Sequence, residues 1–124
     1  MPGPQDVDIK PVVWIGTSRR DLRKLPGDVQ DVFGYALYLA QNGKKHLSAK
    51  PLKGFGGASV LEVVEDHRGD TYRAVYTVKY VEAVYVLHVF QKKAAHGIAT
   101  PRQEIELIKE RMKRAQEFHD SFKR

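Results

Sequence analysis

The sequence contains no cysteine, which excludes a disulfide framework, a thiolate nucleophile and any metal site built from cysteine. It also lacks an apolar run near the ~20 residues that a helix needs to span a bilayer. Its first residues have neither the basic nor the apolar segment of a signal peptide. We therefore expect a cytoplasmic protein that makes no contact with a membrane.

Motifs that define several enzyme classes are absent as well. There is no P-loop, no dinucleotide-binding fingerprint and no serine or cysteine nucleophile motif. Acidic residues do occur together at Glu62, Glu65 and Asp66, but the alternation around Val63 and Val64 would place them on different faces of a strand. This spacing disfavours a metal-dependent nuclease, and we expect neither a metal nor another cofactor.

What the chain does have is an excess of positive charge. Its 124 residues include 21 Lys and Arg against 15 Asp and Glu, a formal net charge of +6, with 42% hydrophobic and 29% charged residues. This length and composition are typical of one globular domain. Basic domains of this kind contact RNA, DNA, the ribosome or acidic proteins, although many soluble domains carry such a charge for solubility alone.

The beginning of the chain predicts an unstructured segment and a strand. Residues 1–9 are rich in Pro, Gly and Asp and show no periodicity, so we expect a disordered N-terminus followed by a single domain over residues 10–124. Residues 10–16 are apolar and β-branched and close on a glycine, which predicts a short strand.

Two consecutive helices should follow as a helical hairpin. The first begins at Thr17 or Ser18 and runs through residue 25; the second begins with Asp28 as its cap and ends at the Asn-Gly pair of residues 42–43. Apolar residues of the second helix recur every three or four positions and should form one buried stripe: Val29, Val32, Phe33, Ala36, Leu37 and Ala40.

A loop and three strands come next. Residues 43–59 are dominated by Gly, Lys, Ser and Pro, which predicts a loop. Three β-type runs follow at residues 60–66, 71–80 and 82–91, and the short connections between them permit only antiparallel pairing. The last run is apolar on both faces, so its strand should be covered on both sides.

The chain ends in a long helix. Thr100 can cap it, Pro101 suits its first position and Glu104 lies in its first turn. A narrow stripe should be buried, whereas Lys109, Lys113 and Arg114 lie off it. The stripe consists of Ile105, Ile108, Met112, Ala115, His119 and Phe122. The predicted fold is α+β: a strand, a helical hairpin, a three-stranded antiparallel run and a C-terminal helix.

Two features of the middle of the chain are candidates for anion binding. The predicted loop places Lys50 and Lys53 beside three glycines, and glycine lets backbone N–H groups approach a phosphate, although the same composition makes an ordinary mobile loop. Arg73 lies inside a predicted strand, where a charged residue is unusual. It faces solvent, binds an anion or forms a cross-strand ion pair with Glu62 or Glu65.

Further candidates lie at the end of the last strand and beyond it. Lys92 and Lys93 are adjacent cations at the mouth of the sheet. His88 has the pKa range of an acid–base catalyst, although a histidine among apolar neighbours is more often a structural residue. The basic face of the last helix is either a solvated surface or a binding face.

The order of five segments resembles the RelE/ParE toxin superfamily, and within it the HigB-like, phage-derived branch. These segments are LKG at 52–54, LEVV at 61–64, YRAVY at 72–76, LHVFQKK at 87–93 and TPRQEI at 100–105. The similarity covers residues 10–115 and rests on the order and spacing of the segments. It implies the toxin of a type II toxin–antitoxin pair, a metal-independent endoribonuclease (mRNA interferase) that cuts mRNA in the ribosome.

The resemblance also implies partners and site residues. The partners would be a cognate antitoxin, often a helix-turn-helix protein, the mRNA and ribosome, and operator DNA reached through the antitoxin complex. Arg73 matches the strand arginine that contacts the scissile phosphate, Lys53 the basic loop position, and Lys92 and Lys93 the basic strand end. The candidate catalytic set consists of Arg73, His88, Lys92 and Lys93.

Lys50, Lys53, Lys79 and His96 form the candidate RNA-binding set. The family's base-stacking tyrosine after the strand end has no counterpart in residues 94–99, where His96 is the candidate substitute.

Two other functions fit the same resemblance. The chain would be a ParE-like inhibitor of DNA gyrase, in which the basic residues form a binding surface without chemistry of their own. Alternatively, it would be an inert phage-derived domain that only binds its antitoxin or operator DNA.

Overall fold

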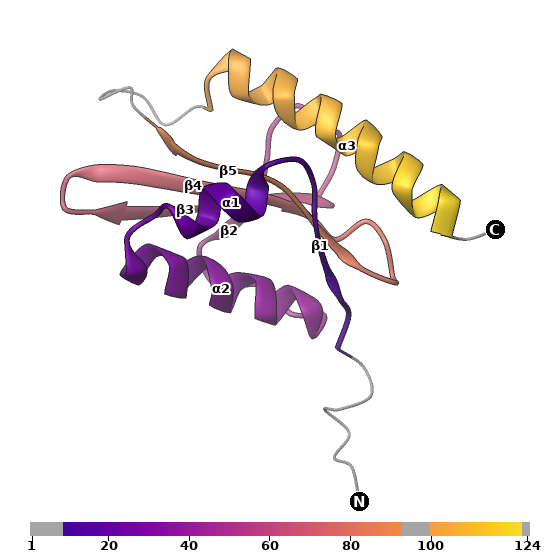
Figure 1. Ribbon diagram of the computed structural model, residues 1–124, viewed down its shortest axis with the longest axis horizontal. Helices are drawn as coiled ribbons and strands as arrows, with labels where there is room; N and C mark the ends of the chain where they lie inside the picture. The colour runs from indigo at the N-terminus through magenta and orange to yellow at the C-terminus, as the bar shows by residue number, and fades with distance from the viewer. Residues whose placement is uncertain (1–8, 93–99, 123–124) are drawn as a thin grey trace, which may run out of the picture.

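The computed structural model describes residues 9–92 and 100–122. Its elements follow one another as β1 (Val12–Trp14), α1 (Ser18–Arg23), α2 (Gly27–Gln41), β2 (Ala49–Pro51), β3 (Val60–His67), β4 (Asp70–Thr77), β5 (Val84–Lys92) and α3 (Arg102–Phe122) (Figure 1). The predicted α+β class is therefore confirmed, and the predicted elements occur in the predicted order, with the strand β2 in addition.

The strands form one five-stranded sheet in the order β1-β5-β4-β3-β2. The predicted antiparallel run β3-β4-β5 forms its interior, β1 pairs parallel to β5 at one edge, and β2 pairs antiparallel to β3 at the other. A two-residue turn joins β3 to β4, with positive φ at both Arg68 (51°) and Gly69 (88°). These are the dihedral signs of the turns that match the twist of a hairpin.

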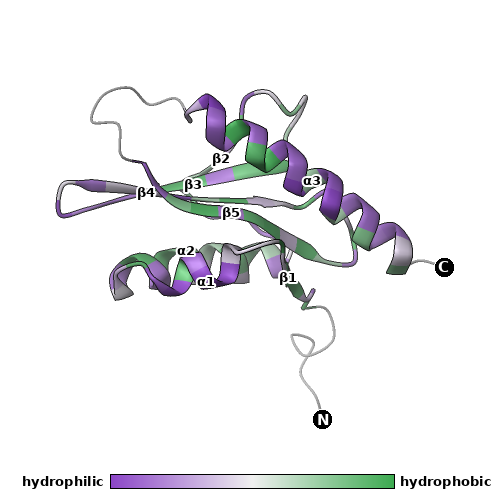
Figure 2. Ribbon diagram, turned by 45° about the horizontal axis from the view of Figure 1, so that its top comes forward, coloured by the Kyte–Doolittle hydropathy of each residue, from purple (hydrophilic) through white to green (hydrophobic). Residues whose placement is uncertain are grey.

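The sheet is covered on both faces. Helices α1 and α2 pack on one face and α3 on the other, as Figure 2 shows. The stripe on α2 is buried against β3–β5 as predicted, except that Val32 is only half-buried. Ile108 and Ala115 of α3 bury fully on the opposite face, between the sheet and the helix. Burial of apolar side chains on both faces is what holds the three layers together.

Several local predictions were wrong. The predicted loop of residues 43–59 contains the strand β2, because Ala49–Pro51 gains backbone partners on β3. Asp28 is not the cap of α2: the helix begins at Gly27 with Pro26 as its N-cap. The strand β4 ends three residues earlier than predicted, and β5 begins two residues later. The connection between them is therefore longer than predicted.

The helix α3 also differs from its prediction in three respects. It begins at Arg102, so the residue directly before the helix is Pro101 and not the predicted cap Thr100. The carbonyl of Pro101 accepts hydrogen bonds from the N–H groups of Glu104 and Ile105. Phe122 is 73% exposed, although it continues the apolar stripe. Arg111, which the predicted stripe leaves out, is only 7% exposed.

An irregularity in the β4–β5 ladder decides which residues face α3. Val75 pairs with His88 but the next residue, Tyr76, pairs with Val86, so Leu87 is an extra residue on β5. A bulge of this kind breaks the strict alternation of side chains. As a result Leu87 packs in the apolar cluster under α3, and the neighbouring His88 also contacts that helix.

The described part of the chain contains no helix of the length and apolarity required to cross a membrane. The expected disordered N-terminus falls outside the described residues, apart from residue 9.

Candidate functional site

Arg73 on β4 lies at the centre of a hydrogen-bonded triad on the α3 face of the sheet. Its Nη1 donates to Glu62 Oε2 on β3 at 3.0 Å and to Thr100 Oγ1 at 3.0 Å. The hydroxyl of Thr100 in turn donates to the same Glu62 oxygen at 2.6 Å. Arg73 is 4% exposed and the Glu62 side chain 13%. The ion pair with Glu62, one of the alternatives predicted for Arg73, is thus present.

The triad borders a cavity of about 310 Å³ between the β2–β3 region and the start of α3. Its lining combines two cations with one carboxylate and an apolar floor: Lys50, Pro51, Leu52, Lys53, Glu62, Thr100 and Ile105. The strand β2 is what places Lys50 here, because Lys50 is the direct cross-strand partner of Glu62. Paired residues of neighbouring strands point to the same face of a sheet.

Lys92 ends β5 and shares this electrostatic environment. It is 7% exposed. Burial lowers the pKa of Lys92, the positive charge of Arg73 lowers it further, and the negative charge of Glu62 opposes both. A lysine with a lowered pKa gives up its proton more readily than one in water. Cationic side chains of β2, β4 and β5 therefore gather around Glu62.

Two of the predicted site residues cannot be placed. Lys93 and His96 lie outside the described residues. Lys79 is described and lies apart from the cavity, in the connection between β4 and β5, where its Nζ donates to Gln116 Oε1 of α3 at 3.1 Å.

His88 belongs to a buried network under α3. Its Nε2 lies 2.8 Å from Glu104 Oε1, and its Nδ1 lies 3.2 Å from Arg111 Nη1. Because an arginine can only donate, Nδ1 is the acceptor and the proton of the neutral ring is on Nε2, which donates to Glu104. Burial lowers the pKa of His88, and Arg111 acts in the same direction, while Glu104 opposes them.

Sequence reasoning missed Glu62 and Thr100 as members of the site. The sequence indicates Glu62 only as an ion-pair partner and as part of an acidic cluster, and Thr100 only as a helix cap. The signal for Glu62 was the turn at residues 68–69: counting outward from it pairs Val64 with Arg73, which leaves Glu62 on the same face, two residues along β3.

No three His, Cys, Asp or Glu side chains within residues 9–92 and 100–122 are grouped so that they could hold a metal ion.

Residues 20–113 match the family model described as phage derived protein Gp49-like (DUF891). The chain belongs to this family. The match confirms the resemblance to the phage-derived branch of the RelE/ParE superfamily drawn from the sequence.

A solved structure is also similar to this Gp49-like chain. The toxin–antitoxin complex RelBE2 from Mycobacterium tuberculosis is similar over 71% of this chain and 97% of that chain, with 23% sequence identity and a TM-score of 0.44. No curated protein matches the chain.

Proposed function

We propose that this Gp49-like toxin cleaves mRNA on the ribosome, and that the cavity beside Arg73 is its active site. The observation that carries the proposal is the buried Arg73–Glu62–Thr100 triad beside a cavity that Lys50 and Lys53 line. Cations next to a positioned carboxylate are what RNA cleavage requires, because the reaction builds negative charge on phosphorus while a proton is removed.

The reaction uses a nucleophile that RNA itself supplies. The 2′ oxygen attacks the adjacent phosphorus, the bond from phosphorus to the 5′ oxygen breaks, and a 2′,3′-cyclic phosphate forms. A base takes the proton of the 2′-OH, and an acid gives a proton to the departing 5′ oxygen. The protein therefore needs no nucleophile of its own, in keeping with the absence of a serine or cysteine motif.

Glu62 is the proposed base. Arg73 and Thr100 both bind Oε2, and within the described part of the chain no hydrogen bond reaches Oε1, so this oxygen is the one that would accept the proton. Held by two donors, the carboxylate stays oriented toward the cavity that it lines.

The cations divide into three proposed roles. Arg73 stabilises the charge that develops on the phosphoryl oxygens. Lys92 donates the proton to the 5′ oxygen, a role that its lowered pKa favours. Lys50 and Lys53 bind the flanking phosphates from the rim of the cavity. On the family resemblance alone, Lys93 remains a proposed catalytic residue and His96 a proposed RNA contact.

We assign His88 a positioning role in place of a catalytic one. Both of its ring nitrogens are engaged, one by Glu104 and one by Arg111. Glu104 lies next to Ile105, which lines the cavity, so His88 holds the start of α3 where Thr100 meets Glu62.

The proposed partners follow from the toxin role. A free toxin harms its host, so we propose a cognate antitoxin, with a helix-turn-helix protein as the expected type, and operator DNA contacted only through that complex. The net charge of +6 favours an acidic segment in the antitoxin and is compatible with a ribosomal site rich in phosphate.

The test is primer extension on an mRNA translated in a cell-free system. Arg73→Ala should reduce cleavage by about 10²–10³, the loss typical of one transition-state donor. Lys44→Ala, on the α2 side of the sheet, is the matched control and should cleave normally. Unchanged cleavage by both Arg73→Ala and Lys92→Ala would refute the site.

Two assays separate the other functions. Inhibition of gyrase supercoiling without mRNA cleavage would support the ParE-like alternative. Normal growth of a host that expresses the intact chain would support the inert domain.

A further inference from the structure

A second basic groove lies beside α3, where the β2–β3 loop and the β4–β5 connection meet the helix. It has a volume of about 330 Å³ and is lined by Phe55, Lys79, Lys109, Met112, Lys113 and Gln116. The four α3 residues among them follow the spacing i, i+3, i+4, i+7 and so lie on one face of the helix. Phe55 comes from the β2–β3 loop and Lys79 from the β4–β5 connection, so three separate segments converge here.

The charge of the groove has one sign. Of its six lining residues three are lysines and none is acidic. Asp120, one turn further along α3, accepts a hydrogen bond from Gln116 Nε2 at 2.8 Å and lies outside this lining. Three ammonium groups that border one groove repel one another, and an anionic ligand would relieve that repulsion.

The floor of the groove is apolar and includes an aromatic ring. Phe55 is half-buried and packs with Met112 against the core cluster beneath α3. It stands between Gly54 and Gly56, which both have positive φ (97° and 69°) and so form a turn that other residues rarely adopt. This turn places the Phe55 ring beside α3.

The groove continues the proposed active site. Lys53 lines the cavity and Phe55 lines the groove, two residues apart on one loop. On α3, Ile105 lines the cavity and Lys109 lines the groove, one helical turn or about 6 Å apart. The cavity and the groove are therefore neighbours along both the β2–β3 loop and α3.

We infer that this groove binds single-stranded RNA next to the cleaved bond, with one base stacked on Phe55 and its phosphates on Lys109, Lys113 and Lys79. Alternation of an aromatic platform with cations is how proteins hold single strands without reading their sequence. The inference rests on the proposed function for the identity of the ligand, and it adds a binding subsite to it.

The experiment measures binding apart from cleavage. The probe is a fluorescein-labelled, mixed-sequence RNA with 2′-O-methyl groups, which cannot be cut, and its affinity is followed by anisotropy from 50 to 200 mM salt. The Lys109→Ala, Lys113→Ala double variant should bind more weakly and reduce the slope of log affinity against log salt by about 1.4, or 0.7 for each lost phosphate contact.

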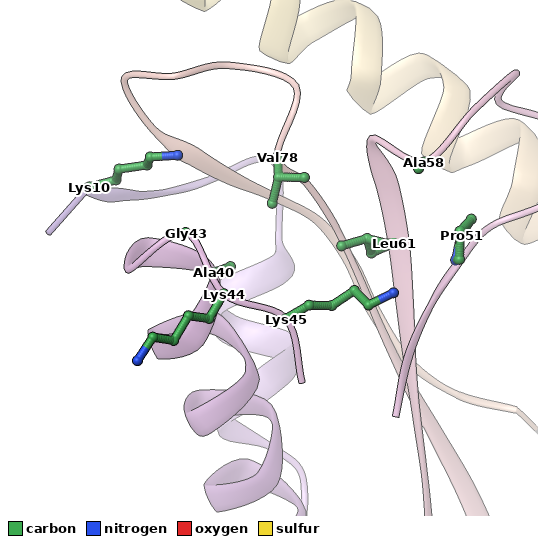
Figure 3. A pocket seen from close by; sticks show the side chains of 9 residues that line it. All are labelled: Lys10, Ala40, Gly43, Lys44, Lys45, Pro51, Ala58, Leu61 and Val78. Carbon is green, nitrogen blue, oxygen red and sulfur yellow. The ribbon is translucent and has the colours of Figure 1, made fainter. Parts of the chain in front are cut away.

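The matched control removes two lysines elsewhere. Lys44 and Lys45 line a cavity of about 350 Å³ at the end of α2, together with Lys10 (Figure 3). This cavity shares Leu61 with the opposite core cluster and so lies across the sheet from α3. The Lys44→Ala, Lys45→Ala double variant has the same net charge as the groove double variant and should keep the slope of the unmodified protein.

Two variants test Phe55: one keeps an apolar side chain without the aromatic ring, and the other keeps an aromatic ring. Phe55→Leu retains apolar packing and should weaken RNA binding about tenfold, whereas Phe55→Trp should retain it. Equal losses of slope in the two lysine pairs, or unchanged affinity in Phe55→Leu, would overturn the inference. Because the probe cannot be cut, loss of cleavage in Arg73→Ala with no effect of the groove variants would refute this subsite and leave the proposed function standing.

Discussion

Arg111 of α3 donates a hydrogen bond from Nη1 to Nδ1 of His88 on β5, at 3.2 Å. The same guanidinium donates to the carbonyl of Leu87 at 2.9 Å and, through Nη2, to Thr17 Oγ1 at 3.1 Å. One buried arginine thereby connects α3, β5 and the start of α1. The arrangement also requires a neutral His88, since a proton on Nδ1 would face a second donor.

Stability should therefore fall as the solution becomes acidic. Burial lowers the pKa of folded His88 below 6.5, so below that pH the unfolded chain binds more protons and unfolding becomes easier. Urea unfolding at pH 7.5 and at successively lower pH should show this loss, beginning near pH 6.5. His88→Gln should be less sensitive to pH in this window, and an identical slope in the variant would contradict the assignment.

Loss of the Arg111 guanidinium should cost more than loss of a surface charge. Arg111→Ala leaves the Leu87 carbonyl and His88 Nδ1 without their buried donor, for an expected loss of about 2–3 kcal/mol. The exposed Arg114 on the same helix is the matched control, and Arg114→Ala should change the free energy of unfolding by no more than about 0.5 kcal/mol. Denaturant midpoints measure both.

Gly16 should be energetically coupled to Arg111. A Cβ on Gly16 would lie 2.9 Å from Arg111 Nε, and Gly16 has a φ of +59°. Gly16→Ala is therefore destabilising for two reasons, strain and collision. In the Arg111→Ala background only the strain remains, so the double variant should be about 1 kcal/mol more stable than the sum of the single variants predicts. Strict additivity would contradict the contact.

Removal of one partner of the Arg73–Glu62 pair should destabilise the fold. Glu62→Ala leaves a buried guanidinium with a lost counter-charge, for an expected cost of about 3 kcal/mol in unfolding free energy. The double variant Glu62→Leu, Arg73→Met fills the same space with apolar groups and should recover much of that loss while remaining inactive. A double variant as unstable as Glu62→Ala would show that packing, and not the loss of the counter-charge, sets the cost.

Tyr76 should be more stable as phenylalanine. The ring is 1% exposed, and within the described part of the chain no group hydrogen-bonds to its hydroxyl. Burial raises the pKa of Tyr76 to about 12, so the folded state keeps a proton that the unfolded chain releases above pH 10. Tyr76→Phe should gain about 1 kcal/mol at neutral pH and lose less stability between about pH 10 and 12, as measured by urea unfolding.

Much of the fold could be predicted because hydrophobic periodicity determined it locally. The stripe on α2 and the runs of β3, β4 and β5 were visible in the sequence because each buries one or both faces. The strand β2 was not, since Ala49, Lys50 and Pro51 have no β-type alternation. They become a strand only by pairing with β3, and that depends on tertiary structure.

The candidate site could be predicted only in part, for a related reason. Composition and the family resemblance indicated Arg73, Lys53 and Lys92, but the partners of Arg73 come from residues 11 and 27 positions away. Arg111 did carry a local signal: it lies between Ile108 and Ala115 on the buried stripe of α3. Its charge argued for solvent, and only the acceptors supplied by β5 and Thr17 explain its burial.

The two outermost strands of the sheet, β1 and β2, are each three residues long, and β2 ends in Pro51, which has no N–H group. The long, apolar strands β3 to β5 are enclosed between them. Short edge strands leave few backbone N–H and C=O groups free to pair with a strand of a second molecule. Such edges disfavour fibril growth and domain swapping. The sheet is therefore poorly suited to extend from one copy of the chain to the next by strand pairing.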